Sequence, residues 1–275
     1  MKTIHIYLLA IVTMLLTQSC IVHNSKEDFG PNTTRTVAVT DFDEVELSGG
    51  LNYIYIEGST PKVTIKGPSK LIDRVEVTQQ GKKLRATTKQ KSGHGRIFGK
   101  NPDDLITVTI QSPTLRNVHV GGAAELKAKR IRTCGDFLLK ASGASDLELG
   151  TLLCANAEMS ASGSSDVEIQ RVECGNLLWQ VSGASDVKVE KAECHSASAK
   201  ASGSSDVELD LTGTETTTAE ASGASDVELR FNRCGTAQAT ASGSSNIELK
   251  GTLRALSKEA TGSSTIDERE LRLGR

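Results

Sequence analysis

Aromatic side chains are scarce in this chain: one Trp, three Tyr and five Phe make up 3% of its 275 residues. A core with so few large rings has to be filled by aliphatic and small side chains, as in folds that stack thin layers. A surplus of positive charge is also lacking, since the formal net charge is −2. That balance argues against a broad basic surface, so no nucleic-acid partner is expected.

Recognisable catalytic motifs are absent as well. The sequence contains no nucleophile elbow, zinc motif or phosphate-binding loop. The three histidines beyond the N-terminal segment, His94, His119 and His195, are scattered along the chain. Because no set of residues forms a catalytic constellation, we expect a protein that is not an enzyme and needs no cofactor.

The N-terminus has the pattern of an exported lipoprotein. Lys2 precedes a mostly apolar stretch over residues 4–16, which is too short for a comfortable membrane span. Thr17-Gln18-Ser19-Cys20 then places a small residue before a cysteine and resembles a lipobox. We therefore predict cleavage before Cys20 and lipid attachment to it, which would anchor the chain to the outer membrane on its periplasmic or cell-surface face. An ordinary signal peptide with a chance cysteine is the alternative.

An internal repeat dominates the C-terminal half. A motif of the type Ala-Ser-Gly-Ser-Ser-Asp-Val-Glu-Leu recurs at a constant step without insertion, beginning at Ala141, Ala161, Val181, Ala201, Ala221 and Ala241. Within each period apolar and polar residues alternate as they do in strands, and the Ser-Gly pair supplies a corner. This pattern predicts an all-β parallel β-helix, a solenoid with three short strands per coil and about 4.8 Å between coils. A helical repeat is excluded because β-branched residues and Gly dominate.

A constant step places every residue over its counterpart 20 positions earlier. The column from Leu147 to Ile247 and the single Trp179 are expected in the core. The column from Gly143 to Gly243 should form a bend that a Cβ would obstruct.

Cysteines form a further column, with Thr214 in its gap: Cys134, Cys154, Cys174, Cys194 and Cys234. A metal site needs ligands that converge on one point, whereas a column spreads them along an axis. Disulfides are conceivable, but stacked parallel side chains put the Cβ atoms slightly too far apart for relaxed geometry. We therefore predict a buried ladder of free thiols.

Two outward-facing columns of carboxylates form what we call the acidic strip: Asp146, Asp166, Asp186, Asp206 and Asp226, with Glu148, Glu168, Glu208 and Glu228 beside them and Lys188 interrupting the glutamates. Like charges about 4.8 Å apart repel by roughly 1 kcal/mol in water. One interpretation is that each Asp accepts hydrogen bonds from corner N–H groups. The other is a ligand strip that holds a row of divalent cations, calcium being the candidate.

Three functional hypotheses fit this architecture. The first is a lipoprotein that binds an extracellular polysaccharide or a surface protein through one solenoid face. The second is a carbohydrate-active β-helix enzyme of the pectinase kind, which uses acidic residues. A catalytic site must break the symmetry of the stack, however, and the carboxylates recur on nearly every coil. The third is a structural envelope protein that self-associates into a homo-oligomer.

The N-terminal half carries a family resemblance. Residues 42–51 (Phe-Asp-Glu-Val-Glu-Leu-Ser-Gly-Gly-Leu), 53–58 (Tyr-Ile-Tyr-Ile-Glu-Gly) and 106–110 (Ile-Thr-Val-Thr-Ile), followed by the Ser-Gly-Ser-Ser-Asp-Val coils, resemble the head GIN domain family of auto-transporter adhesins, common as Bacteroidetes-type lipoproteins. The resemblance covers about residues 37–266. It implies a right-handed β-helix with an adhesive or scaffolding role at the cell surface, and it transfers no catalytic residue.

The expected organisation follows the chain in five parts: a signal peptide over 1–19, a lipidated N-terminus and linker over 20–35, an irregular β part that caps the solenoid over 36–120, regular coils over 121–266 and a tail over 267–275.

Overall fold

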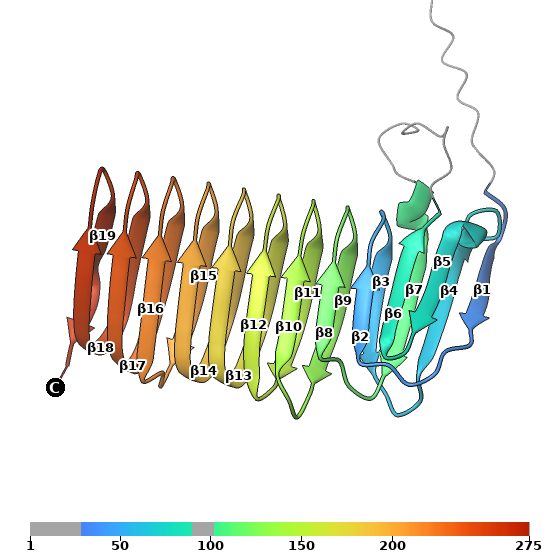
Figure 1. The fold of residues 1–275 in the computed structure, drawn as a ribbon, viewed down its shortest axis with the longest axis horizontal. Helices are drawn as coiled ribbons and strands as arrows, with labels where there is room; N and C mark the ends of the chain where they lie inside the picture. Colours follow the sequence, from blue (N-terminus) through green and yellow to red (C-terminus); the bar gives the residue numbers. More distant parts are fainter. Residues whose placement is uncertain (1–28, 90–101, 275) are drawn as a thin grey trace, which may run out of the picture.

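The computed structural model describes residues 29–89 and 102–274, which form a β-solenoid of nineteen strands and about eight turns. Figure 1 shows the strands stacked side by side along the long axis, with β1 at one end and β19 at the other. The fold predicted from the sequence repeat is therefore confirmed. The predicted signal peptide, Cys20 and His94 lie outside the described residues. In the ranges described, no helix is long and apolar enough to cross a membrane.

The regular coils run from the green to the red strands of Figure 1. Their strands are β8 (Asn117–Val120), β9 (Glu125–Arg132), β10 (Phe137–Ala141), β11 (Asp146–Leu153), β12 (Asn156–Ala161), β13 (Asp166–Val181), β14 (Asp186–Ala201), β15 (Asp206–Thr212), β16 (Thr216–Ala221), β17 (Asp226–Ala241), β18 (Asn246–Ala260) and β19 (Thr265–Leu273). All pairings among these strands are parallel.

The coils of β13 and β14 pair with each other in three stretches. Between β13 and β14 the paired residues fall at 166–169, 172–174 and 176–181, and each residue lies opposite the one 20 positions later. The interruptions at 170–171 and 175 are where the chain changes direction. The three short strands expected per coil are thus three ladder segments, even where one strand label runs through all of them.

The core lies inside the coils and is made of stacked columns. The column from Leu147 to Ile247 is 0–2% exposed at every coil, and Trp179 is completely buried. Both core predictions are confirmed. Apart from Trp179, Met159 and Phe231, the inward residues of the regular coils beyond residue 140 are small or aliphatic, as the scarcity of aromatic residues requires.

The N-terminal strands stack in an order that differs from their order along the chain. These strands are β1 (Asn32–Val37), β2 (Glu44–Leu47), β3 (Asn52–Glu57), β4 (Lys62–Pro68), β5 (Val75–Gln80), β6 (Lys83–Thr88) and β7 (Thr107–Ser112), with short 3-10 helices η1 (Ile72–Arg74) and η2 (Pro102–Leu105). The β2–β3 coil lies between the β6–β7 coil and the β8–β9 coil and is parallel to both. Beyond the β6–β7 coil, β1, β4 and β5 pair antiparallel and close this end of the stack.

Glycine makes the sharp corner of every regular coil. Gly183 has a φ of +83°, and a Cβ built there would lie 2.5 Å from the carbonyl oxygen of Gly163. The corners are part of the ladder, because Ala184 N donates to Gly163 O at 2.8 Å. The predicted need for glycine in this column is confirmed, and it has two causes: a left-handed backbone and contact with the coil below.

These two causes can be separated by substitution. Gly183→Ala should lower the free energy of unfolding by about 3 kcal/mol, because a left-handed non-glycine residue costs about 1–2 kcal/mol and overpacking adds about 1–3 kcal/mol. Gly213 has a φ of +66° with nothing within 4 Å of the position that a Cβ would take, so Gly213→Ala should cost only about 1 kcal/mol. Urea unfolding followed by circular dichroism measures both. Equal losses for the two variants would show that contact between corners does not constrain the fold.

Candidate functional site

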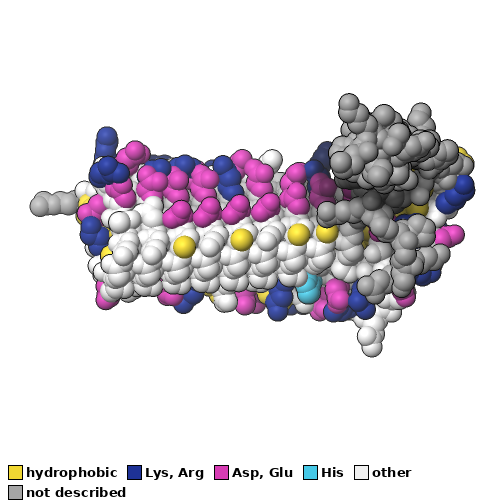
Figure 2. All heavy atoms as spheres, turned by 90° about the horizontal axis from the view of Figure 1, so that it is seen from above, with side chains coloured by type: hydrophobic (Ala, Val, Ile, Leu, Met, Phe, Trp, Pro, Cys, Tyr) yellow, Lys and Arg dark blue, Asp and Glu magenta, His cyan; other side chains and the backbone are white. Residues whose placement is uncertain are grey.

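The acidic strip is a continuous feature of one face. Each of its five aspartates begins a strand, from Asp146 in β11 to Asp226 in β17. The four register pairs from Asp146↔Asp166 to Asp206↔Asp226 place these carboxylates directly over one another. Figure 2 shows the result as rows of acidic side chains along the solenoid. With the four glutamates and Lys188, the aspartates line a shallow groove of about 580 Å³.

The two columns of the strip differ in how their charge is neutralised. Glu148 pairs with Lys127 at 2.8 Å, and Glu228 pairs with Arg230 at 2.7 Å and Lys250 at 2.8 Å. Glu208 pairs with Arg230 and, at 3.4 Å, with Lys188. In the described part of the chain, none of the five aspartates has an ion pair, so their charges face solvent uncompensated.

This arrangement raises the pKa of two of the five aspartates, Asp206 and Asp146. Partial burial raises the pKa of Asp206, the neighbouring carboxylates Asp186 and Asp226 raise it further, and the N–H of Asp226 opposes the shift. The pKa of Asp146 is also raised, first by partial burial and then by the charges of surrounding carboxylates, Glu125 foremost. The ionised forms of Asp146 and Asp206 therefore carry an electrostatic cost in the folded protein.

The corners are held first by the ladder between coils, and the N–H of Asp226 also acts on the carboxylate of Asp206. The corner N–H groups of Ser162, Ser164 and Asp166 donate to carbonyls of the preceding coil at 2.7–3.0 Å, so the ladder already engages them. A buried serine one position before each aspartate ties the corner. Ser165 Oγ donates to Ser162 O at 2.7 Å, and the same bond recurs in the coils of Ser205, Ser225 and Ser245 at 2.8–3.0 Å.

The acidic strip does not by itself bring together the side chains that a metal ion needs as ligands. Among the residues that the structure describes, no three His, Cys, Asp or Glu side chains are grouped so that they could hold a metal ion. A cation on the strip would therefore need ligands from a second molecule, because calcium takes six to eight oxygens.

The cysteine column differs from its prediction in one respect. All five cysteines are free, but only Cys194 and Cys234 are buried, and Cys134 is exposed. The step between coils is 21 positions where Arg132 faces Leu153 and 20 where Phe137 faces Ala157. This shift places Thr133, 7% exposed, beneath Cys154 and displaces Cys134 to the surface.

A second candidate site lies where the repeat is interrupted. Residues of β3, β9, β11 and β13 line a hollow of about 960 Å³. The β3–β9 pairing stops at Tyr55↔Ala128, and the β9–β11 pairing skips Gly150, where a Cβ would lie 2.4 Å from Lys129 O. One wall carries Ile54 and Ile56, 39% and 46% exposed.

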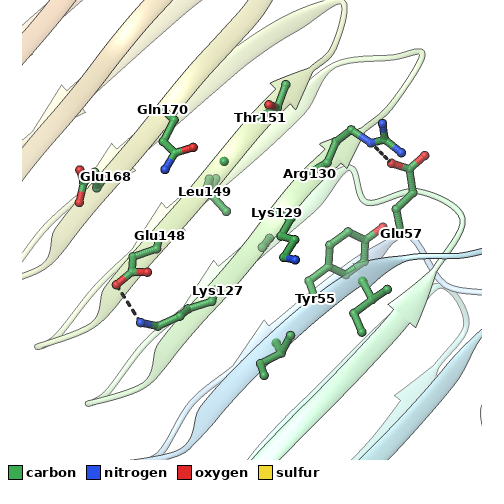
Figure 3. Close-up of a pocket in the computed structure, with 14 residues that line it drawn as sticks. Tyr55, Glu57, Lys127, Lys129, Arg130, Glu148, Leu149, Thr151, Glu168 and Gln170 are labelled. Atoms are coloured by element: carbon green, nitrogen blue, oxygen red, sulfur yellow. Dashed lines mark hydrogen bonds and ion pairs between the residues drawn. The ribbon is translucent and has the colours of Figure 1, made fainter.

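Charged groups surround this hollow, as Figure 3 shows. Arg130 Nε donates to Glu57 Oε2 at 2.6 Å, and Lys127 Nζ donates to Glu148 Oε1 at 2.8 Å. Between them lies Lys129, which has no ion pair in the structure as described. The site therefore combines an exposed aliphatic wall with one uncompensated cation. The sequence does contain a signal for it: Ile54 and Ile56 alternate with the buried Tyr53 and Tyr55, so this strand is apolar on both faces.

The remaining sequence candidates stay dispersed. His119 lies in β8 beside Ser142 at 3.4 Å, and His195 lies in β14 at 3.7 Å from Glu215. Neither histidine lines the acidic groove or the hollow.

Comparison with known proteins places the chain in a family. A family model described as "Putative auto-transporter adhesin, head GIN domain" matches residues 41–232. Among solved structures, a putative adhesin from Parabacteroides distasonis is similar with a TM-score of 0.70 and 16% identity, over 86% of this chain and 97% of that one. No curated protein matches the chain.

Two further structures share the fold. A putative adhesin from Bacteroides fragilis has a TM-score of 0.62 and 19% identity, over 86% of this chain and 96% of that chain. A putative lipid binding protein from Parabacteroides distasonis has a TM-score of 0.68 and 18% identity, with the same coverage. At these identities the likeness establishes the fold alone.

The raised pKa of Asp206 predicts that the free energy of unfolding depends on pH. Because the pKa of Asp206 is raised in the folded protein, the unfolded chain loses this proton first, and stability falls as pH rises above the ordinary value of 3.8. Asp206→Asn should therefore raise the free energy of unfolding at pH 7 by roughly 0.5 kcal/mol, a small amount because solvent screens the charges. The gain should vanish as pH falls through the pKa of Asp206, when urea unfolding is measured between pH 3 and pH 7.

The matched control removes the same charge two residues away. Burial raises the pKa of Glu208, but its hydrogen bond to Arg230 and the charges of Arg230 and Lys188 lower it overall. Glu208→Gln should therefore reduce stability at pH 7. If both variants shift stability in the same direction, the two columns do not differ in how their charge is compensated.

Proposed function

The chain belongs to the head GIN domain family of putative auto-transporter adhesins, and from this premise we propose that it is a non-enzymatic binding protein of the cell envelope. The family and its structural relatives suggest an extracellular or cell-surface protein that is not an enzyme. The proposal adds a lipid anchor on Cys20, which would attach the chain to the outer membrane and present the solenoid to its surroundings.

The observation that carries the proposal is the uncompensated aspartate column, which continues in register over five strands along one groove. A repeated surface suits a repeated ligand, because each coil adds one weak contact and the contacts act together. The negative charge favours a basic segment of a surface protein, or an acidic polysaccharide bridged to the strip by calcium.

The repetition also separates this proposal from catalysis. A hydrolytic site needs one acid and one base whose environments differ, so that the two carboxyl groups have different pKa values. The aspartates of the strip have nearly equivalent surroundings, coil after coil. Equivalent carboxylates are suited to binding along a line and not to cleavage at one point.

Binding can be tested with a charge-neutral strip. The full chain in detergent should bind at least one component of a panel of polysaccharides and host-matrix proteins, with or without calcium. Changing Asp166, Asp186 and Asp206 together to Asn should weaken that binding at least tenfold, since each lost charge contact is worth roughly 0.5 kcal/mol or more. Surface plasmon resonance at two salt concentrations measures both affinity and its electrostatic part.

The control variant removes three negative charges elsewhere: Glu158, Glu215 and Glu220 changed to Gln, none of which lines the groove. It should retain wild-type affinity. If no panel component binds, or if both triple variants bind like wild type, the strip is not a ligand surface. A structural role with self-association would then be favoured, which sedimentation of the full chain can detect.

A second candidate function is favoured by the hollow. The exposed pair Ile54 and Ile56 beside the uncompensated Lys129 fits a single-chain anionic amphiphile, with its aliphatic part on the isoleucines and its carboxylate on the lysine. The similar structure described as a putative lipid binding protein supports this candidate.

Dodecanoate is a suitable probe for this second site. Changing Ile54 and Ile56 together to Thr should weaken dodecanoate binding roughly tenfold, because about 1–2 kcal/mol of apolar contact is lost. Lys129→Gln should weaken it less and remove its salt dependence. Lys62→Gln, an exposed lysine outside the hollow, serves as the control. Calorimetry that finds equal affinity in all four proteins would contradict the assignment.

A further inference from the structure

Three cysteines occupy the same position on consecutive coils. Cys174 in β13 lies directly opposite Cys194 in β14. Cys154 follows the pair Leu153↔Glu173, and its N–H donates to Glu173 O at 3.2 Å. The thiol of Cys174 lies next to those of both Cys154 and Cys194. Threonines stand at the neighbouring positions of the column, Thr133 on one side and Thr214 on the other. The three thiols therefore form an isolated group inside a single chain.

The two contacts in this group are not equivalent. Cys174 and Cys194 both lie within paired strands, where the ladder holds stacked Cβ atoms slightly farther apart than a relaxed disulfide allows. Cys154 lies just after β11, and the pairing resumes only at Asn156↔Asn176. Its backbone lies in this gap between two paired stretches and keeps the bond from its N–H to Glu173 O. A small adjustment in the gap can bring its sulfur into bonding geometry with Cys174.

Exposure to solvent also distinguishes Cys154 and Cys174 from Cys194. Cys154 and Cys174 are partly exposed, whereas Cys194 is buried with its sulfur 3.6 Å from Thr214 Oγ1. The hydrogen bond from Cys174 lowers the pKa of the Cys154 thiol although burial opposes the shift, and the same bond raises the pKa of Cys174 to about 12. Cys154 is thus the thiol of the group that reaches its reactive thiolate form most readily.

We propose that Cys154 and Cys174 are a modification site, at which a low-molecular-weight disulfide oxidises the two thiols to a disulfide bond that joins successive coils. The Cys154 thiolate, its proton released to water, attacks one sulfur of the oxidant and forms a mixed disulfide while one thiolate leaves. Cys174, deprotonated in its turn, then attacks the Cys154 sulfur and expels the second thiolate. Two protein thiols and one oxidant disulfide thus become one protein disulfide and two free thiols. The bond closes the loop between the two cysteines, which is one full coil. Export would carry the chain into surroundings where such bonds persist.

Trypsin separates all the described cysteines, which makes the test direct. Cleavage after Lys and Arg puts the five of them into the peptides 133–140, 141–171, 172–188, 192–200 and 234–250. The full chain in detergent is exposed to oxidised glutathione, alkylated under native conditions, denatured, alkylated with a second label and digested. The expected product is peptide 141–171 linked to 172–188, with Cys134 carrying the first label or glutathione and Cys194 carrying the second label.

Two variants complete the experiment. Cys174→Ser should leave Cys154 as a mixed disulfide with glutathione, which identifies the thiol that attacks first. Cys134→Ser removes the exposed cysteine that lies outside the group and should leave the 154–174 link unchanged. The proposal is overturned if wild-type protein yields only mixed disulfides, if 172–188 is linked to 192–200 instead, or if the link joins two chains through Cys134. The wild-type result decides the matter even if a variant fails to fold.

Discussion

The inter-coil ladder is the constraint on which the rest of the structure depends. Between β13 and β14 and between β15 and β17 the coils repeat with a constant step of 20, so hydrogen bonding between coils sets equivalent side chains over one another. Apolar and small residues gain from this arrangement, since a column of Val or Ala packs in the same way at every level. Ionised residues are destabilised by it, because each charge is held one strand spacing away from the equivalent charge on the next coil. A residue type that recurs at one position of the coil therefore forms a continuous column along one face of the solenoid.

The acidic strip shows two outcomes of that constraint. Three of its four glutamates are neutralised by basic side chains, such as Arg230 in β17 and Lys250 in β18, which reach glutamates of their own coil or of the preceding one. The aspartates sit at the first residue of each strand, next to the corner, and have no such partner among the described residues. The corner itself is closed by the buried serines. A row of carboxylates without ion pairs is where binding should be sought, because sites depart from local stability rules for function.

Sequence periodicity could predict whatever is the same in each coil and little of what differs. The core columns, the corner glycines and Trp179 follow from one coil by translation. The ladder between coils also engages the corner N–H groups, and the pattern of a single coil does not contain it. Cys134 left its column because one coil step is 21 positions, and the Cys-to-Cys spacing of 20 conceals that change. The sequence carries no local signal that the β2–β3 coil lies between the β6–β7 coil and the β8–β9 coil. Stacking these coils in the order of the chain would bury the same faces of their strands.

A solenoid can bind a ligand through its repeated surface or at a place where the repeat is interrupted. In this protein these two kinds of site are adjacent. The acidic groove and the hollow share Glu148 and Glu168 in their linings. Lys127 forms an ion pair with Glu148 at this boundary. A ligand that drew Lys127 away would leave this carboxylate of the strip without its basic partner. An anion in the hollow and a cation on the strip should then favour each other, since each compensates charge that the other uncovers. The irregular coils at the start of the stack and the regular coils beyond them would in that case form one binding surface with two parts of opposite charge preference.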